Sequence, residues 1–207
     1  EALAAKVEDA GSEAFVVSLD VTSTTSVQAM VEAVMEKYGR IDSLVNNAGW
    51  TSTGPLLEET ADNWDRTLDT SLKGVFLCSQ RVGRVMATQH SGTIVNIGST
   101  LGQVVFHNRG IYAAAKGGLE QLTKAFALEL SQYGVRCNAV GPCFTETPTR
   151  RNLLENKEFT DWALSMLPLG RWAQPDDIVL PVLMLASEAI PLMTGQVILV
   201  DGGWTLQ

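Results

Sequence analysis

Residues 92–142 decide the fold, and they read GTIVNIGSTLGQVVFHNRGIYAAAKGGLEQLTKAFALELSQYGVRCNAVGP. An apolar run at 92–99 comes first, a helical pattern follows at 112–134, and a second apolar run ends the stretch at 135–142. Short apolar runs bounded by turn residues are typical of strands that are buried on both faces. A strand, a helix and a strand in this order predict two parallel strands joined by a right-handed crossover.

The same alternation continues along the rest of the chain. Its segments are the end of a helix at 1–11, a strand at 14–20, a helix at 23–38 that stops at Gly39, a strand at 43–49, a helical stretch at about 62–89, a helix at 175–187 and a strand at 196–203. We therefore expect an α/β fold in three layers, a doubly wound parallel sheet of the Rossmann-like type. No repeat or linker divides the chain, so residues 1–207 are predicted to form a single domain.

Composition excludes several classes of partner. The formal net charge is -8, and no cluster of Lys and Arg is present to neutralise the phosphates of a nucleic acid. No apolar run approaches the roughly 18 residues that a membrane span needs, and no signal peptide opens the chain. Cys78, Cys137 and Cys143 lack CxxC spacing and His90 and His107 are isolated, so neither a disulfide framework nor a metal site is predicted. We expect a soluble, cytoplasmic protein without nucleic-acid or membrane partners.

A long segment of weak periodicity, residues 143–172, follows directly on the strand predicted at 135–142. Ligands in open α/β sheets bind beside the carboxyl ends of the strands. Long loops in compact domains are often lids or binding segments. The segment is therefore predicted to cover the substrate, with an irregular surface helix as the alternative.

Tyr112 and Lys116 are four residues apart at the start of a predicted helix, so they lie on one face about one turn apart. Ser99 ends a predicted strand shortly before them, and the end of that strand and the start of that helix can converge. A positive charge beside a phenol favours its ionised form and brings a pKa near 10 toward neutrality. The three side chains could therefore orient a carbonyl and exchange a proton with it. A Tyr-x-x-x-Lys pair alone is a weak signal, because many surface helices contain one.

Several motifs occur together in a fixed order. They are NNAG at 46–49, Ser99, YAAAK at 112–116, GP at 141–142, LGRWAQPDD at 169–177 and TGQVILVDGG at 194–203. In order and spacing this set resembles the short-chain dehydrogenase/reductase family over essentially the whole chain. The resemblance implies an oxidoreductase that transfers a hydride between NAD or NADP and an alcohol or carbonyl substrate. It also implies a homotetramer, in which the helical stretches at 62–89 and 110–133 and the C-terminal strand region form the contacts.

The resemblance assigns roles to four reactive side chains. Tyr112 is the proton donor or acceptor, Lys116 assists it and holds the nicotinamide ribose, and Ser99 positions the reacting oxygen. Ser71 stands where the family commonly has an Asn that relays protons through water. A hydroxyl is shorter than an amide group and lacks the amide's separate donor and acceptor ends, so we expect a slower or rerouted proton relay.

The resemblance also implies cofactor contacts at three further places. They comprise Asp20 and Val21 at the adenine, Asn47, Ala48 and Gly49 on the adenosine side, and Pro142, Thr145 and Thr147 at the nicotinamide amide and phosphate. Two of these residues have structural alternatives. Asp20 can form a helix N-terminal turn, and Thr147 can cap a helix that follows it.

The sequence departs from the family pattern at its beginning. The glycine-rich phosphate loop and the first strands do not occur in it, including the strand whose end discriminates NAD from NADP. Because the chain opens in mid-helix with Glu1, the simplest interpretation is that an N-terminal stretch was lost, unresolved or omitted, with a natural minimal form as the alternative. Cys143 stands where the family usually has Gly, and its side chain either narrows the nicotinamide pocket or points away from it.

Two substrate classes remain open. PLGRWAQP, DGGW and GSTLGQ resemble gluconate 5-dehydrogenases and other sugar-acid or polyol dehydrogenases, whereas YAAAK and GPCFTET resemble 3-oxoacyl-carrier-protein reductases. We expect a sugar acid or polyol, with a β-ketoacyl thioester as the alternative. A catalytically weak dinucleotide-binding regulatory or scaffold protein is a further alternative. Substrate contacts are predicted at His107, Arg109, Trp50 and Cys143, with Trp172 as another pocket wall; a solvated loop or a core position is the alternative.

Overall fold

The computed structural model describes residues 2–147 and 155–206. Within these residues one sheet of four parallel strands is present, and the strands lie side by side in chain order. They are β1 (Ser43–Asn46), β2 (Gly92–Ile97), β3 (Val135–Pro142) and β4 (Val197–Val200). Parallel strands end at the same edge of a sheet, so the segments after β1, β2, β3 and β4 all begin there.

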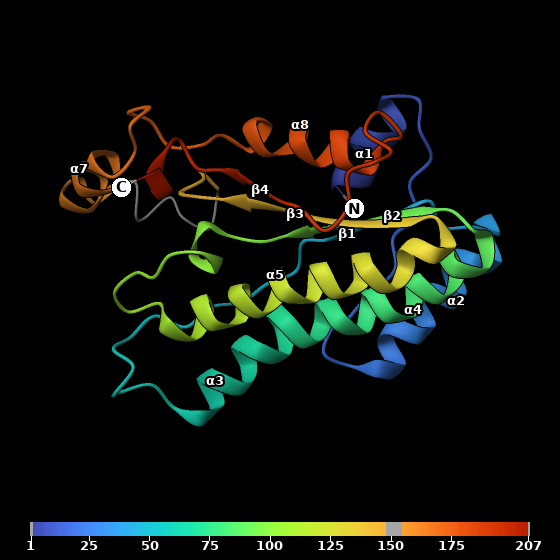
Figure 1. Ribbon diagram of the computed structural model, residues 1–207, viewed down its shortest axis with the longest axis horizontal. Coiled ribbons are helices and arrows are strands. Elements are labelled where there is room, and N and C mark those ends of the chain that lie inside the picture. The colour runs from blue at the N-terminus through green and yellow to red at the C-terminus, as the bar shows by residue number, and fades with distance from the viewer. Residues whose placement is uncertain (1, 148–154, 207) are drawn as a thin grey trace.

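Helices cover both faces of this sheet, which confirms the predicted three-layer fold (Figure 1). One face carries α2 (Thr24–Tyr38), α3 (Ala61–Leu68), α4 (Gly74–Gln89) and α5 (Gly110–Leu130). The other face carries α1 (Ala2–Asp9) and α8 (Pro175–Ala186). Ile94 and Val95, neighbours on β2, point to opposite faces and are both fully buried, as expected for a sheet covered on both sides.

The predicted ends of α2 are confirmed by its caps. The Ser23 hydroxyl accepts a hydrogen bond from Ser26 N at 3.3 Å, which satisfies one of the free donors of the first turn. At the other end Gly39 has φ 72°, the left-handed conformation that glycine adopts most easily.

The strand predicted at residues 14–20 is wrong. The segment has no regular structure, although Phe15 packs edge-on against Tyr38 at 6.2 Å. Phe15 is 43% exposed and Val16 65% exposed. A strand needs a hydrogen-bonded neighbour, and no described residue provides one here, so the apolar pattern alone is insufficient.

The helical stretch predicted at 62–89 forms, but a π-helical turn interrupts it. This turn, η1 (Asp69–Lys73), joins α3 to α4, and Gly74 N donates to Asp69 O across five residues. Single π turns inside α-helices often mark functional positions. Here the turn carries Ser71, which is fully buried.

The segment predicted to cover the substrate contains a helix of its own, α7 (Lys157–Ser165), which lies at the end of the molecule near the C-terminus (Figure 1). Residues 148–154, and with them any helix that Thr147 could cap, lie outside the described residues. The described residues also include three short helices: η2 (Thr100–Gly102), η3 (Ser131–Tyr133) and η5 (Trp204–Leu206). Ala163 on α7 and Leu167 after it are buried in a cluster with Trp204, so α7 is packed onto the body of the protein.

Candidate active site

Ser99 lies at the carboxyl end of β2, at the start of η2. Gly98 N donates to Val140 O of the neighbouring strand at 2.7 Å, which continues the sheet pairing up to this point. Ser99 itself has an extended backbone, and its hydroxyl accepts a hydrogen bond from Leu101 N at 3.2 Å. The hydroxyl oxygen is thus held in place while its proton can still be donated.

Lys116 ties the first turns of α5 to the end of the same strand. Its Nζ donates to Ile97 O at 2.6 Å and lies 5.5 Å from the centre of the Tyr112 ring. Ser99, after the strand, and Tyr112, on the helix, line the same two cavities. The predicted convergence of strand end and helix start is what the structure shows.

Burial changes the charge balance of Lys116. The side chain is 4% exposed, and the loss of hydration lowers its pKa from 10.5 to about 8. The ammonium form still predominates at neutral pH. A cation is therefore fixed beside the Tyr112 ring.

Ser71 is joined to the loop after β1. Its hydroxyl donates to Trp50 O at 2.7 Å and accepts from Trp50 N at 3.0 Å. Both backbone groups of Trp50 are thus held by one side chain from the π turn. The Trp50 ring points elsewhere, with the Arg66 guanidinium 4.3 Å from its centre.

A small cavity, called here the inner cavity, opens beside Ser99 and Tyr112, and its volume is about 60 Å³. Its wall is formed by Thr51, Ser99, Thr100, Leu101, Phe106, Arg109, Tyr112, Cys143, Phe144, Phe159 and Trp204. Arg109 is held there by hydrogen bonds from Nη1 to Ser52 O at 3.2 Å and to Thr51 Oγ1 at 3.4 Å. The cavity therefore has a polar side with a cation and an aromatic side.

Two larger clefts lie beside the inner cavity and the end of β1. The large cleft, about 510 Å³, includes Asn47, Ser99, Tyr112, Pro142, Cys143, Thr145 and Thr147 in its wall. The edge cleft, about 210 Å³, includes Leu19, Val21, Asn47 and Ala48 in its wall. Val45 and Asn47 line both clefts, so the two are neighbours.

Other residues that the sequence singles out lie outside these cavities. Asp20 is exposed, and its carboxylate accepts hydrogen bonds from Thr22 N at 2.9 Å and Thr22 Oγ1 at 2.8 Å, which form a turn before α2 and lower the pKa of Asp20. His107 is exposed and lines none of the three cavities. Trp172 is 4% exposed and packs against Phe144 in the aromatic cluster.

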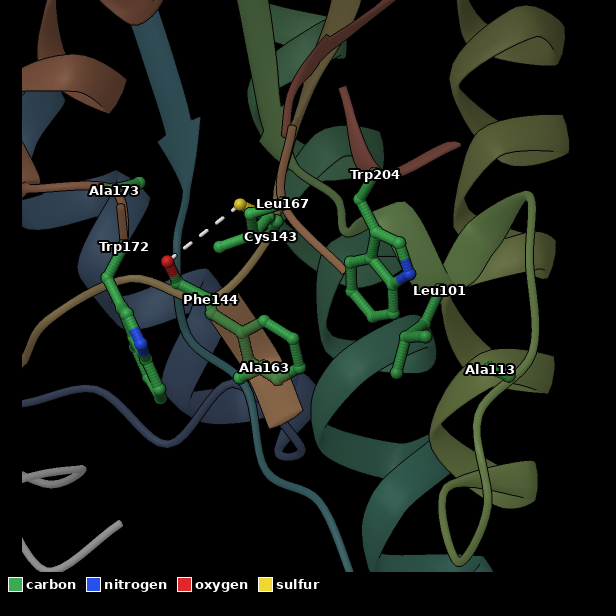
Figure 2. Packing of buried hydrophobic residues seen from close by; sticks show 9 residues of the cluster. All are labelled: Leu101, Ala113, Cys143, Phe144, Ala163, Leu167, Trp172, Ala173 and Trp204. Carbon is green, nitrogen blue, oxygen red and sulfur yellow. Dashed lines mark hydrogen bonds between the residues drawn. The ribbon is translucent and has the colours of Figure 1, made fainter. Parts of the chain in front are cut away.

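Sequence reasoning missed most of the aromatic side of the inner cavity. Phe106, Phe144, Phe159 and Trp204 come from three segments that are distant in the sequence. Figure 2 shows Phe144 between Trp172 and Trp204, with Cys143 next to it. The sequence offered one signal, the concentration of aromatic residues in 143–172, and that signal gave no information on which rings meet.

Comparisons with known proteins decide the family. A family model described as enoyl-(acyl carrier protein) reductase matches residues 1–205. A 3-oxoacyl-[acyl-carrier-protein] reductase of Thermotoga maritima is 43% identical over 187 residues, which are 89% of this chain and 74% of the relative. The chain belongs to the short-chain dehydrogenase/reductase family. The predicted family is thereby confirmed.

Solved structures of this short-chain dehydrogenase/reductase family agree with the fold. A gluconate 5-dehydrogenase from Burkholderia cenocepacia, in complex with NADP and tartrate, is 34% identical in sequence with a TM-score of 0.95. The match covers 100% of this chain and 81% of the Burkholderia chain. A short-chain type dehydrogenase/reductase from Mycobacterium marinum is 31% identical with a TM-score of 0.95, and the match covers 100% of this chain and 82% of that one.

Membership in this family determines the type of reaction. The chain is an oxidoreductase that acts on CH–OH groups of a small-molecule substrate, with NAD or NADP as its cofactor. Among the described residues no group of three or more His, Cys, Asp and Glu side chains is placed to hold a metal ion. None of the described helices has the length and apolar character needed to span a membrane.

Proposed function

We propose that this dehydrogenase interconverts a small hydroxylated substrate, a sugar acid or polyol, and the corresponding ketone, with a hydroxy acid as the favoured class. The observation that carries the proposal is Arg109, which lines the same cavity as Ser99 and Tyr112. A guanidinium pairs with a carboxylate through charge-assisted hydrogen bonds. The inner cavity, about 60 Å³, is far below the 300 Å³ or more of cavities for drug-sized ligands, which favours a small substrate.

The reactive oxygen of the substrate would lie between Ser99 and Tyr112. Ser99 donates a hydrogen bond to the carbonyl oxygen and orients it, and Tyr112 gives that oxygen a proton during reduction or removes it during oxidation. Lys116, whose Nζ is 5.5 Å from the centre of the Tyr112 ring, stabilises the phenolate. When bound, the nicotinamide supplies or accepts the hydride. Ser71 acts on the reaction by holding Trp50 in the adjacent loop.

The two neighbouring clefts fit a cofactor with two ends. In the large cleft Pro142, Thr145 and Thr147 lie beside Ser99 and Tyr112, where they would contact the nicotinamide end. In the edge cleft Val21 and Ala48 would contact the adenosine end, and Asn47 lines both clefts. Gly49 and Asp20 border this region without lining either cleft. The Burkholderia relative, which carries NADP, supports NADP as the cofactor to test first.

A 3-oxoacyl-carrier-protein reductase is the second candidate, supported by the 43% identity to the Thermotoga enzyme. The gluconate 5-dehydrogenase relative and its bound tartrate, a small hydroxy acid, support the first. A carrier-bound acyl chain requires an extended channel, and the inner cavity ends at packed aromatic rings. These features favour the hydroxy acid.

Replacing Arg109 tests the proposal. The native protein, with whatever sequence it carries beyond residues 1–207, is assayed at the absorbance band of reduced nicotinamide with 5-ketogluconate, gluconate, tartrate and a β-ketoacyl thioester. Arg109→Gln should raise the KM for the acids by about 10- to 100-fold, since hydrogen bonds to charged groups contribute about 1.5–3 kcal/mol. Arg84→Gln, at an exposed position on α4, is the matched control. Turnover of the thioester alone, with no effect of Arg109→Gln, would favour the second candidate.

We also propose a homotetramer in the cytoplasm. Phe76 on α4 and Leu128 on α5 are 38% and 79% exposed, and an intersubunit contact through these helices would cover them. Cys78 and Cys137 are buried cysteines that form no disulfide bond, which suits a reducing compartment. Light scattering at micromolar concentration tests the assembly, and a monomer would contradict it.

A further inference from the structure

Four aromatic rings form one side of the inner cavity: Phe106, Phe144, Phe159 and Trp204. Their packing is mutual. Phe144 stacks on Trp204 with ring centres 4.9 Å apart and an interplanar angle of 16°, and Phe159 meets Phe144 edge-on at 5.8 Å. Figure 2 shows the Phe144 and Trp204 rings side by side. This aromatic wall is therefore a set of mutually packed rings, of which Phe144 and Trp204 are buried.

A fifth ring, Trp162 on α7, lies behind this wall and contacts three of its members. It stacks on Phe106 at 4.8 Å with an angle of 15°, and it meets Phe159 at 5.6 Å and Phe144 at 5.8 Å. Trp162 is not among the residues that line the inner cavity. Its effect on a substrate would therefore be indirect, through the rings that it supports.

The stack of Phe106 on Trp162 joins two segments that carry different parts of the site. Phe106 belongs to the loop that leads from η2 into α5, the helix of Tyr112 and Lys116. Trp162 belongs to α7, in the segment predicted to cover the substrate. The contact therefore packs α7 against the loop that enters α5.

We propose that Trp162 is a specificity-determining residue that limits the length of the substrate. The inference rests on the proposed function, because it takes the inner cavity as the substrate site. Arg109 and the aromatic wall line the same cavity, so a short acid held by Arg109 would lie against these rings. A longer chain would have to displace Phe106 or Phe144, and Trp162 holds both. The enzyme thus excludes extended acyl chains even though relatives such as the Thermotoga reductase are similar in sequence.

The test compares substrate length profiles of the wild type and Trp162→Ala. Two homologous series are used with the native protein: unbranched keto acids and β-keto N-acetylcysteamine thioesters, each from four to eight carbon atoms. In Trp162→Ala, kcat/KM for the longest member relative to the shortest should rise at least tenfold, mainly through a lower KM for the longest. Trp162→Phe, which keeps a ring, should retain the wild-type profile.

Two further variants guard against a general effect of losing a large side chain. Trp64→Ala removes another tryptophan, 46% exposed on α3, and should leave the length profile unchanged. If Trp162→Ala does not fold, judged by circular dichroism, Phe106→Leu removes the ring that stacks on Trp162. This variant should also raise kcat/KM for the longest substrate relative to the shortest. A purely structural role would lower kcat/KM for all lengths alike.

The outcomes separate this inference from the proposed function. A folded Trp162→Ala or Phe106→Leu with an unchanged length ratio overturns the role of Trp162, while Arg109-dependent turnover of short acids leaves the proposed function intact. If the wild type reduces only the thioesters, the proposed function fails. The role of Trp162 is then tested with the thioester series alone, by the ratio of kcat/KM for the longest member to that for the shortest.

Discussion

Replacing Lys116 by Met is expected to stabilise the protein while it removes the activity. The Lys116 side chain is 4% exposed, and burial lowers its pKa from 10.5 to about 8. The gap between these two values corresponds to about 3 kcal/mol against folding at pH 7, where the side chain is charged in both states. Met has a similar length and no charge, so the variant keeps the packing without that cost.

The loss of one hydrogen bond reduces the expected gain. Lys116 Nζ donates to Ile97 O at 2.6 Å, and Met leaves this carbonyl without that partner at a cost of about 1–3 kcal/mol. The free energy of unfolding of Lys116→Met, measured without cofactor, should therefore exceed that of the wild type by up to about 2 kcal/mol at pH 7. Turnover should fall by at least ~100-fold, because the proton exchange of Tyr112 loses its neighbouring cation.

The sign of the pH dependence follows from the lowered pKa. Between about pH 8 and pH 10.5 folded Lys116 has released its proton while the unfolded side chain retains it. Stability rises with pH wherever the unfolded state binds more protons. The free energy of unfolding of the wild type should therefore rise relative to that of the variant across this window. Urea unfolding at pH 7, 8, 9 and 10, without cofactor and at one protein concentration, measures the difference.

Lys6→Met, at an exposed position on α1, is the control and should show no such trend. The reasoning is refuted by a Lys116→Met variant that is less stable than the wild type at pH 7, with a difference that stays constant up to pH 10. In that case the buried ammonium of Lys116 would not destabilise the folded state.

Two other substitutions test structural contacts of the site. Ser71→Ala should lower the free energy of unfolding by about 1–3 kcal/mol, because Trp50 N and O both lose a buried partner; an unchanged midpoint in urea would contradict this. Asp177→Asn should flatten the acid side of the stability profile. The hydrogen bond from Arg171 lowers the pKa of Asp177 from 3.8 to about 2, so its contribution is present above about pH 4 and is lost toward pH 2; parallel Tm curves from pH 2 to pH 6 would speak against it.

The positions of Ser99, Tyr112 and Lys116 could be predicted from the sequence because local rules determine where these residues lie. Ser99 lies two residues after the end of β2, and Tyr112 and Lys116 lie in the first two turns of α5. In a parallel sheet the strand ends and the helix starts meet at one edge, so their convergence needs no tertiary information. The boundaries of β3, Val135–Pro142, follow in the same way from a single apolar run.

The features that sequence reasoning missed depend on distant partners. Residues 14–20 have the apolar pattern of a strand, yet a strand forms only beside a neighbour, and the pattern contains no information on neighbours. The stack of Phe106 on Trp162 likewise joins residues of two segments whose separation in space is set by the whole fold. Aromatic residues in a loop predict burial but leave open which rings pair.

The π turn at Asp69–Lys73 has a consequence for every residue after it in α4. A π turn amounts to one inserted residue, and one residue rotates an α-helix by about 100°. The rows of side chains that α3 and α4 present to α5 are therefore out of phase with each other. Deleting one residue from the turn would bring them into phase and rotate the buried row of α4, including Val82 and Met86, away from the sheet. A change of the same size in an exposed loop would rotate nothing, so this turn is a place where the chain should tolerate substitution far better than deletion.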